Sequence, residues 1–386
     1  TMGGDTYGIG GKRCDRNVGN SFYFMARDHG AGGGLDTRYL WKTDGTASGT
    51  VQVKDVNNAN VTGGWSTCGI IGDTLFFVKQ DTRQLWKTNG TPSGTKMVID
   101  MDSLSPSGYG ELNWNFASIN NKLYFGASDG TNGIELWALD PANITGLSGG
   151  SGSGSGSNSG TYNGNGTAWM VNDIHSGSSA SSPNHLTAVG NTLYFQADDG
   201  ASGIELWKSD GTSSGTVMVK DIQSGGSSSS SSPDQLTAVG NTLYFKADDG
   251  ASGIELWKSD GTSSGTVMVK DIHSGSSDSS PNHLTAVGNT LYFTANDGTN
   301  GIELWKSDGT TSGTVMVKNI HSSSSSAPAR LTAVGNTLYF SAYDGTNGTE
   351  LWKSDGTESG TVLVKDIQSG VGGSNPGMFG VIGNTL

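Results

Sequence analysis

Hydrophobic and polar positions alternate along many short stretches of this chain. In residues 192–197 the order is Thr-Leu-Tyr-Phe-Gln-Ala, and similar stretches are separated by Gly-Asn and Asp-Gly pairs. Alternation with a period of two, bounded by such turn signals, is typical of β-hairpins. No apolar stripe occurs at helical spacing, so the pattern predicts antiparallel strands and no helix.

One stretch, residues 186–222, shows the full pattern. It predicts four strands, at residues 186–189, 192–197, 204–208 and 216–222, joined by Gly-Asn, Asp-Asp-Gly and Asp-Gly-Thr turns. Nearly the same sequence returns later in the chain, and weaker copies precede it. A copied unit of roughly 50 residues that contains four strands is the size of a propeller blade.

The third predicted strand carries apolar residues on both faces. Ile204 and Leu206 lie on one face and Trp207 lies on the other. A strand of a propeller blade is covered on both sides, because each blade is packed between two others. The chain is therefore predicted to be an all-β protein, a β-propeller of seven four-stranded blades, with an eighth blade as the alternative if the chain continues.

The whole chain, residues 1–386, is predicted to form this single propeller, and seven tryptophans mark the copies: Trp41, Trp86, Trp137, Trp207, Trp257, Trp305 and Trp352. The predicted blades are residues 11–56, 66–101, 113–174, 185–222, 235–272, 283–320 and 330–367. The third blade contains a Gly/Ser-rich insertion at residues 146–166, which is expected to be a flexible loop. Residues 379–386 restate the start of the unit and are expected to be a closing strand or the start of a further blade.

The recurring sequence motif also resembles that of a known repeat family. Glu205, Glu255, Glu303 and Glu350 each begin the sequence ELWKSDGT, and Gly-Thr follows three residues later. From about Asn20 onward the chain resembles the ELWxxDGT repeat family of large secreted or surface proteins of microbes. The resemblance implies an extracellular repeat protein and attaches no general activity to it.

Composition narrows the classes of partner. The net charge is −13, which disfavours nucleic acid and anionic membrane and leaves cations and neutral glycans as better candidates. No run of apolar residues is long enough to span a bilayer. The chain starts at Thr1 without a hydrophobic leader, so we expect a processed or partial chain.

Two features fit a secreted protein. Five Asn-x-Ser/Thr sequons are candidates for N-glycosylation, at Asn60, Asn89, Asn143, Asn165 and Asn347. The two cysteines, Cys14 and Cys68, fall on the first strands of neighbouring predicted blades. A disulfide between them is predicted, with two buried free thiols as the alternative.

The acidic loops are the first candidates for chemistry. Each well-kept copy has an Asp-Gly loop followed by a glutamate, and these carboxylates are weak candidates for Ca²⁺ ligands: Asp199, Glu205, Asp249, Glu255, Asp297, Glu303, Asp344 and Glu350. They lack the ligand spacing of a calcium loop. The favoured interpretation is that the aspartates shape turns and that each glutamate pairs with a strand lysine such as Lys208. No cofactor is predicted, and calcium is kept as the alternative.

Other residue types give less. Five histidines recur in the joints and are expected to be exposed loop residues, with weak metal binding as the alternative: His175, His185, His273, His283 and His321. The tryptophans are expected to pack blades together, and stacking on sugars is the alternative. No nucleophile elbow or phosphate-binding loop occurs, so no catalytic residue is predicted and the chain is not expected to be an enzyme.

These observations lead to a functional prediction. We expect a secreted, non-catalytic propeller that serves as a structural or adhesive module of a cell-surface or filamentous assembly and contacts other extracellular proteins or copies of itself. The alternative is a lectin-like propeller with repeated, possibly calcium-dependent glycan sites. A hydrolase or lyase at the central channel is the third choice.

Overall fold

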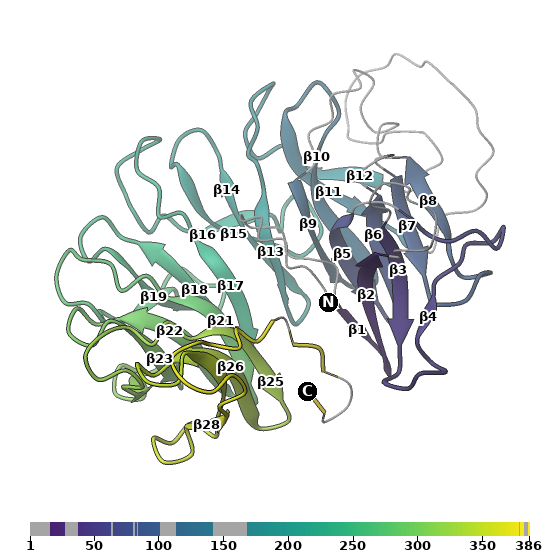
Figure 1. The fold of residues 1–386 in the computed structure, drawn as a ribbon. Helices are drawn as coiled ribbons and strands as arrows, with labels where there is room; N and C mark the ends of the chain where they lie inside the picture. The colour runs from purple at the N-terminus through teal and green to yellow at the C-terminus, as the bar shows by residue number, and fades with distance from the viewer. Residues whose placement is uncertain are drawn as a thin grey trace, which may run out of the picture.

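The computed structural model describes residues 16–27, 38–62, 65–79, 82, 84–100, 113–141, 168–377, 379–381 and 385–386. These residues form seven four-stranded antiparallel sheets and no α-helix. The sheets follow one another around a ring, as the blades of a propeller (Figure 1). The predicted fold, an all-β propeller of seven blades, is confirmed. The predicted insertion at residues 146–166 lies outside the described residues.

In every blade the four strands are neighbours in the order of the sequence. Blade 1 consists of β1 (Arg16–Val18), β2 (Ser21–Arg27), β3 (Arg38–Thr43) and β4 (Val51–Gln52). Blade 2 consists of β5 (Trp65–Ile71), β6 (Thr74–Lys79), β7 (Gln84–Thr88) and β8 (Lys96–Asp100). Blade 3 consists of β9 (Asn113–Ile119), β10 (Lys122–Ser128), β11 (Ile134–Leu139) and β12 (Ala168–Asn172).

The remaining four blades are close copies of each other. Blade 4 consists of β13 (Asn184–Val189), β14 (Thr192–Asp198), β15 (Ile204–Ser209) and β16 (Val217–Lys220). Blade 5 consists of β17 (Asp234–Val239), β18 (Thr242–Asp248), β19 (Ile254–Ser259) and β20 (Val267–Lys270). Blade 6 consists of β21 (Asn282–Val287), β22 (Thr290–Asn296), β23 (Ile302–Ser307) and β24 (Val315–Lys318). Blade 7 consists of β25 (Ala329–Val334), β26 (Thr337–Tyr343), β27 (Thr349–Ser354) and β28 (Val362–Lys365).

The first strand of each blade faces the centre of the ring. β9 lies beside β13, β13 beside β17, and β17 beside β21, while the fourth strands lie at the rim (Figure 1). Because neighbouring blades meet along their first strands, the central channel is lined by short strands of successive repeats.

The core is a series of layers between blades. Leu206 and Val219 of blade 4 pack against Phe245 and Trp257 of blade 5, and all four side chains are buried. Phe245 is completely inaccessible to solvent, and burying such a side chain stabilises the fold by about 2 to 3 kcal/mol. The two-sided apolar pattern of the third strand therefore has the predicted cause: one face contacts the preceding blade and the other contacts the following blade.

Two strand boundaries of blade 4 differ by two residues from the sequence-based prediction. β13 begins two residues earlier than expected, at Asn184, because His185 has a positive φ of 57° and the pairing with β14 shifts register there. β16 ends at Lys220, although the apolar pattern extends to Ile222. The backbone N–H of Ile222 donates to the carboxylate of Glu205 instead of to a neighbouring strand.

Polar contacts repeat at the interfaces between neighbouring blades, which we call seams. The ammonium of Lys208 donates to the carbonyl oxygen of Gly261 in the next blade at 2.8 Å. The ammonium of Lys220 donates to the carbonyl oxygen of Thr266 at 2.9 Å and lies 5.7 Å from the ring centroid of Trp257. The interfaces between blades 4 and 5, 5 and 6, and 6 and 7 are therefore each held by an apolar layer with lysine contacts beside it.

The C-terminal segment approaches the first blade. A Cβ atom placed on Gly380 would meet the ring of Phe22, which lies on β2. In Figure 1 this segment runs from blade 7 across the interval that separates it from blade 1. Residues 382–384, part of the predicted closing strand or further blade at residues 379–386, lie outside the described residues.

We expect Gly261→Ala to destabilise the protein more than Gly240→Ala does. Both glycines have positive φ, of 88° and 58°, so both substitutions strain the backbone. Only the Cβ at position 261 would collide with the hydroxyl of Tyr194, whereas nothing lies within 4 Å of the Cβ at position 240. Urea unfolding followed by tryptophan fluorescence should place the difference at about 1 to 3 kcal/mol. Equal losses would show that the close approach of Tyr194 is not a stability determinant.

Candidate functional site

The most conspicuous polar group in each of blades 3 to 7 is a buried carboxylate. Glu205, the second residue of β15, is 0% exposed. Its oxygens accept from the backbone N–H of Ile222 at 2.9 Å, from the backbone N–H of Ser231 at 3.0 Å and from the hydroxyl of Ser231 at 2.6 Å. Three donors compensate for the loss of water around the carboxylate, which is what a buried charged group requires.

Ser231 connects two blades through this carboxylate. It lies in the joint between blades 4 and 5, and its carbonyl oxygen accepts from the N–H of Asp248 in blade 5 at 3.0 Å. The same arrangement recurs with Glu135 and Ser181, Glu255 and Ser279, Glu303 and Ser326, and Glu350 and Ser374. Each buried glutamate therefore fixes the joint that carries the chain into the next repeat.

These serines were missed by sequence reasoning, which treated the joints as Ser-rich linkers. A signal was present, because each serine stands two residues before a proline, as in Ser231-Ser-Pro233. The residue between them has a positive φ in every case, for example 46° at Ser232. A recurrent Ser-x-Pro marks a constrained bend that presents its serine to the glutamate.

The predicted pairing of glutamate with a strand lysine is wrong. The ammonium of Lys208 reaches the next blade and donates to Gly261, while Glu205 is saturated by Ser231 and Ile222. A carboxylate can accept backbone N–H groups deep inside the fold, whereas the lysine ammonium keeps its end at the seam, where carbonyl oxygens are available.

The aspartates of the acidic loops serve their own turns. The carboxylate of Asp199 accepts from the backbone N–H of Ala201 at 2.9 Å and of Ser202 at 2.7 Å. Asp249, Asp297 and Asp344 hold equivalent loops. Among the described residues no group of three or more acidic, histidine or cysteine side chains has a geometry suited to a metal ion. The Asp/Glu pairs thus do not converge as the candidate calcium ligands would require.

Burial shifts the pKa of most of these glutamates. Desolvation raises the pKa of Glu135, Glu205, Glu255 and Glu303, although hydrogen bonds from serine and isoleucine oppose the rise. At Glu350 desolvation acts in the same direction, but hydrogen bonds from Ser374 and Ile367 outweigh it and the pKa is lowered. The five equivalent carboxylates therefore divide into two classes.

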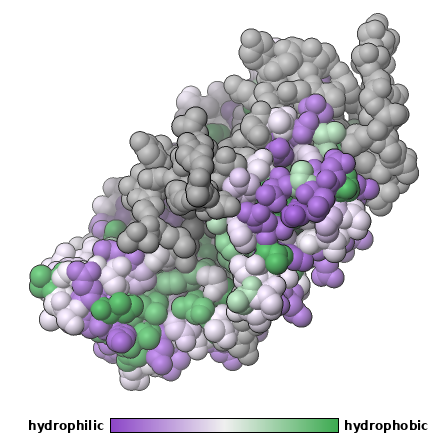
Figure 2. Space-filling view, turned by 45° about the vertical axis from the view of Figure 1, so that its right-hand side comes forward, coloured by the Kyte–Doolittle hydropathy of each residue, from purple (hydrophilic) through white to green (hydrophobic). Residues whose placement is uncertain are grey.

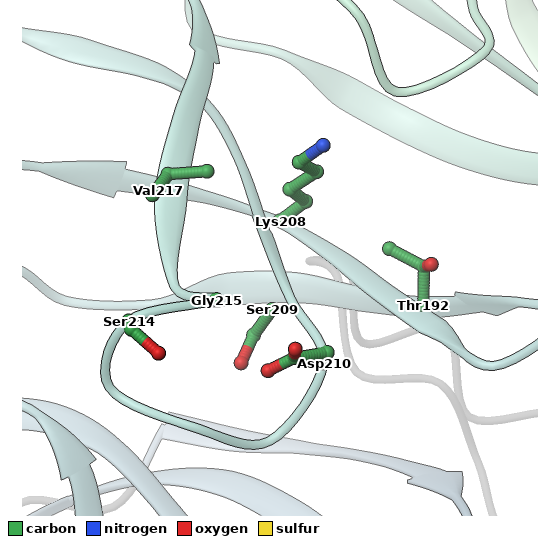
Figure 3. Close-up of a pocket in the computed structure, with 7 residues that line it drawn as sticks. All are labelled: Thr192, Lys208, Ser209, Asp210, Ser214, Gly215 and Val217. Atoms are coloured by element: carbon green, nitrogen blue, oxygen red, sulfur yellow. The ribbon is translucent and has the colours of Figure 1, made fainter.

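A shallow cavity of about 300 Å³ lies beside the hairpin that joins β15 to β16 (Figure 3). Seven residues line it: Thr192, Lys208, Ser209, Asp210, Ser214, Gly215 and Val217. The carboxylate of Asp210 accepts from the N–H of Thr212 at 2.9 Å and from its hydroxyl at 2.7 Å, and these bonds lower its pKa. This is the Asp-Gly-Thr turn of the repeat, and its polar atoms are occupied by the turn itself.

The first strands bring charged side chains together near the central channel. Nδ1 of His185 lies 3.2 Å from one carboxylate oxygen of Asp234, and the ammonium of Lys246 lies 3.1 Å from the other. Although desolvation alone would raise it, the pKa of Asp234 is lowered because His185 and Lys246 favour the charged form. These contacts join blades 4 and 5 and give the inner strands a mixed-charge surface.

Three of the remaining histidines, His175, His273 and His321, support the joints and are not freely exposed loop residues as expected, whereas His283 is exposed. A Cβ placed on Gly200 would collide with the ring of His175, and the same holds for Gly298 with His273 and for Gly345 with His321. Each of these histidines is half-buried against the acidic loop of the following blade. Desolvation, followed by the charge of Arg330, lowers the pKa of His283.

The other predicted site residues lie as follows. Trp207, Trp257, Trp305 and Trp352 are buried in the seams, as expected for packing residues. Cys68 is a buried free thiol and Cys14 lies outside the described residues, so the predicted disulfide is not shown. Of the sequons, Asn60 and Asn89 are exposed, the amide nitrogen of Asn347 donates to Asp344, and Asn143 and Asn165 lie outside the described residues.

Most of the repeated polar groups thus make hydrogen bonds that hold blades and joints together. Buried glutamates face serines and backbone, and the loop aspartates face their own N–H groups. Within the described residues, the contact of Asp234 with His185 and Lys246 and the shallow cavity beside the hairpin that joins β15 to β16 are polar sites that stay partly accessible. In the described part of the chain no helix has the length and hydropathy needed to cross a bilayer.

Comparison with known proteins extends the description of the fold. No protein-family model and no curated protein sequence matches the chain. Among solved structures, a prolyl endopeptidase (TM-score 0.53, 12% identity) matches 90% of this chain and 48% of its own. Puromycin hydrolase (TM-score 0.50, 14% identity) matches 94% of this chain and 54% of its own. The β-propeller domain of the Trilobed protease from Pyrococcus furiosus matches at a TM-score of 0.46, 9% identity, with 92% and 97% coverage.

These comparisons correct the functional prediction. The fold is shared with puromycin hydrolase and with a prolyl endopeptidase, which are named as hydrolytic enzymes and not as structural, adhesive or glycan-binding proteins. The expected structural or adhesive module and its lectin-like alternative are therefore withdrawn. Identities of 12 to 14% indicate a common fold only, and the chain spans about half the length of puromycin hydrolase and of the prolyl endopeptidase.

The two classes of buried glutamate should give opposite pH dependences. Because the folded pKa of Glu255 is raised, its stabilisation is present below the unfolded value of 4.5 and is lost as pH rises through the folded pKa. The difference in unfolding free energy between the wild type and Glu255→Gln should therefore shrink as pH rises, with a slope of at most about 1.4 kcal/mol per pH unit. Urea unfolding between pH 3 and pH 7 measures it.

Glu350→Gln is the matched control for this experiment. Its folded pKa is lowered, so its stabilisation is present above the unfolded value of 4.5 and is lost as pH falls through the folded pKa. The wild-type advantage over this variant should therefore grow as pH rises. The same sign of slope in both variants would contradict the assignment.

Proposed function

We propose that this chain is the non-catalytic propeller domain of a peptidase-related protein. The observation that carries the proposal is the pair of matches at TM-scores of 0.50 and 0.53, in which at least nine-tenths of this chain superimposes on about half of the other protein. In the prolyl endopeptidases, inter-domain dynamics has a role in catalysis and specificity. We infer that this chain would likewise act through its position relative to a second domain.

The residues of this chain support a scaffolding role within such a protein. The repeated carboxylates, which would be the obvious acid or base groups, are buried beneath hydrogen bonds to serine and backbone. General acid–base catalysis needs a group within hydrogen-bond reach of a substrate, and Glu205 is 0% exposed. The same bonds hold blades in fixed relation, so the propeller offers a rigid surface to a neighbouring domain.

The proposal is tested with peptide substrates. We expect the purified chain to release no product from chromogenic prolyl and aminoacyl peptides under conditions in which a prolyl endopeptidase, as positive control, is active. The natural protein that carries this sequence, isolated from its source with antibodies to the purified chain, should hydrolyse such peptides, and an active-site-directed fluorophosphonate should block it.

The proposal has two parts, the absence of catalysis by this chain and the relation of the whole protein to peptidases, and a different result would contradict each part. Turnover by the purified chain alone would mean that the propeller is itself catalytic. A natural protein that neither hydrolyses the peptides nor reacts with the fluorophosphonate would remove the relation to peptidases.

A further inference from the structure

Blade 7 exposes a face that the other blades bury. Val364 and Ile367 are 43% and 56% exposed, whereas the equivalent Val317 and Ile320 of blade 6 are 6% and 8% exposed. Figure 2 shows hydrophobic residues gathered on the lower-left part of the molecule, where Figure 1 places the last blades. The repeat has the same apolar residues here as elsewhere, but no blade formed by the described residues covers them.

Two further members of this face are only partly buried. Tyr339 and Leu351 are half-buried, whereas Tyr292 and Leu304, their equivalents in blade 6, are 5% and 0% exposed. We call Tyr339, Leu351, Val364 and Ile367 the outer face of blade 7. It spans three strands, β26, β27 and β28, and Ile367, which lies two residues after the end of β28.

Two lysines on this side also lack the contacts that their equivalents make. In blade 6 the ammonium of Lys306 donates to the carbonyl oxygen of Gly356 at 2.9 Å, and that of Lys318 donates to the carbonyl oxygen of Thr361 at 2.9 Å and lies 6.0 Å from the ring of Trp352. The equivalent Lys353 and Lys365 of blade 7 are exposed.

The interface between blades 6 and 7 shows which kind of surface covers the equivalent face of blade 6. The outer face of blade 6 is covered by Leu338, Phe340, Ala342 and Trp352 of blade 7, which are 0 to 6% exposed. The lysines of blade 6 donate hydrogen bonds to carbonyl oxygens of blade 7, one in its Asp-Gly-Thr turn and one in the Gly-Thr pair that follows the turn. A partner for the exposed face of blade 7 must therefore supply both an apolar layer and carbonyl oxygens for the lysines. The face that each unit of this repeat turns toward the preceding blade supplies both.

Blade 1 is not seated in that place. Phe22 and Phe24, at the positions of the buried Leu338 and Phe340, are half-buried and stack on each other with ring centroids 6.1 Å apart. Gly380 of the C-terminal segment lies against Phe22. The sequence of residues 382–386, Ile-Gly-Asn-Thr-Leu, matches the Val-Gly-Asn-Thr-Leu of residues 334–338 that leads into β26.

We propose that the outer face of blade 7, with Lys353 and Lys365, is a docking surface for a further four-stranded unit of the same repeat. The interaction continues the series of blade-on-blade seams already present in the chain and adds an eighth blade between blades 7 and 1. It is independent of the proposed relation to peptidases, since it rests on the repeat chemistry alone.

The test compares two equivalent positions in two chains. The first chain is the protein as it stands; the second carries a copy of residues 339–370 after Leu386, which completes the unit whose opening sequence residues 382–386 repeat. In the first chain Val364→Ser should leave the melting temperature within about 1 °C, because the side chain is exposed, while Val317→Ser should lower it by about 5 °C. In the second chain Val364→Ser should become as destabilising as Val317→Ser.

A second measurement reports the docking directly. Hydroxyl-radical footprinting of residues 362–367 should show strong labelling in the first chain and a several-fold loss of labelling in the extended chain. Light scattering gives the mass of both chains, and we expect both to be monomers.

Three results would overturn the proposal. Strong destabilisation by Val364→Ser in the unextended chain would mean that this face is already covered within the molecule. Unchanged labelling in the extended chain would mean that the added unit does not dock. A concentration-dependent dimer of the unextended chain that Val364→Ser abolishes would assign the face to a second copy.

Discussion

The burial of one blade against the next is the interaction on which this structure depends. Third strands such as β15 carry apolar residues on both faces, so an isolated blade would leave one or both of them in water. Stability in such an array is a sum of contacts between neighbours, and no single central core exists. The protein has a core only because its units are placed side by side.

The buried glutamate also constrains how one blade is placed relative to the next. A carboxylate can be removed from water only where donors replace it, and Glu205 receives them from the end of its own blade and from the joint beyond. The joint is thereby fixed relative to the sheet, and the next blade starts at a defined position. A carboxyl group buried inside the repeat thus sets the path of the chain around the ring.

These two conditions explain why the repeated polar residues give the protein little evident chemistry. Groups that would attract attention as ligands or catalysts are occupied by turns, joints and seams. What distinguishes one blade from another lies at the inner strands and at blade 7, where the regular pattern meets no further copy. Similarity to peptidases at identities of 12 to 14% concerns the architecture, which many sequences can build from the same layers.

The repeat, its four strands, the two-sided burial of Trp207 and Leu206 and the number of blades could all be predicted from the order of residues, because period-two alternation and turn residues are local signals. That order did not reveal that Glu205 bonds Ser231, that Lys208 reaches Gly261, or that Ile367 is exposed while Ile320 is buried. Those contacts join residues far apart in the chain. Near-identical units also carry no local signal of which one lacks a neighbour, so the packing of the folded molecule alone determines it.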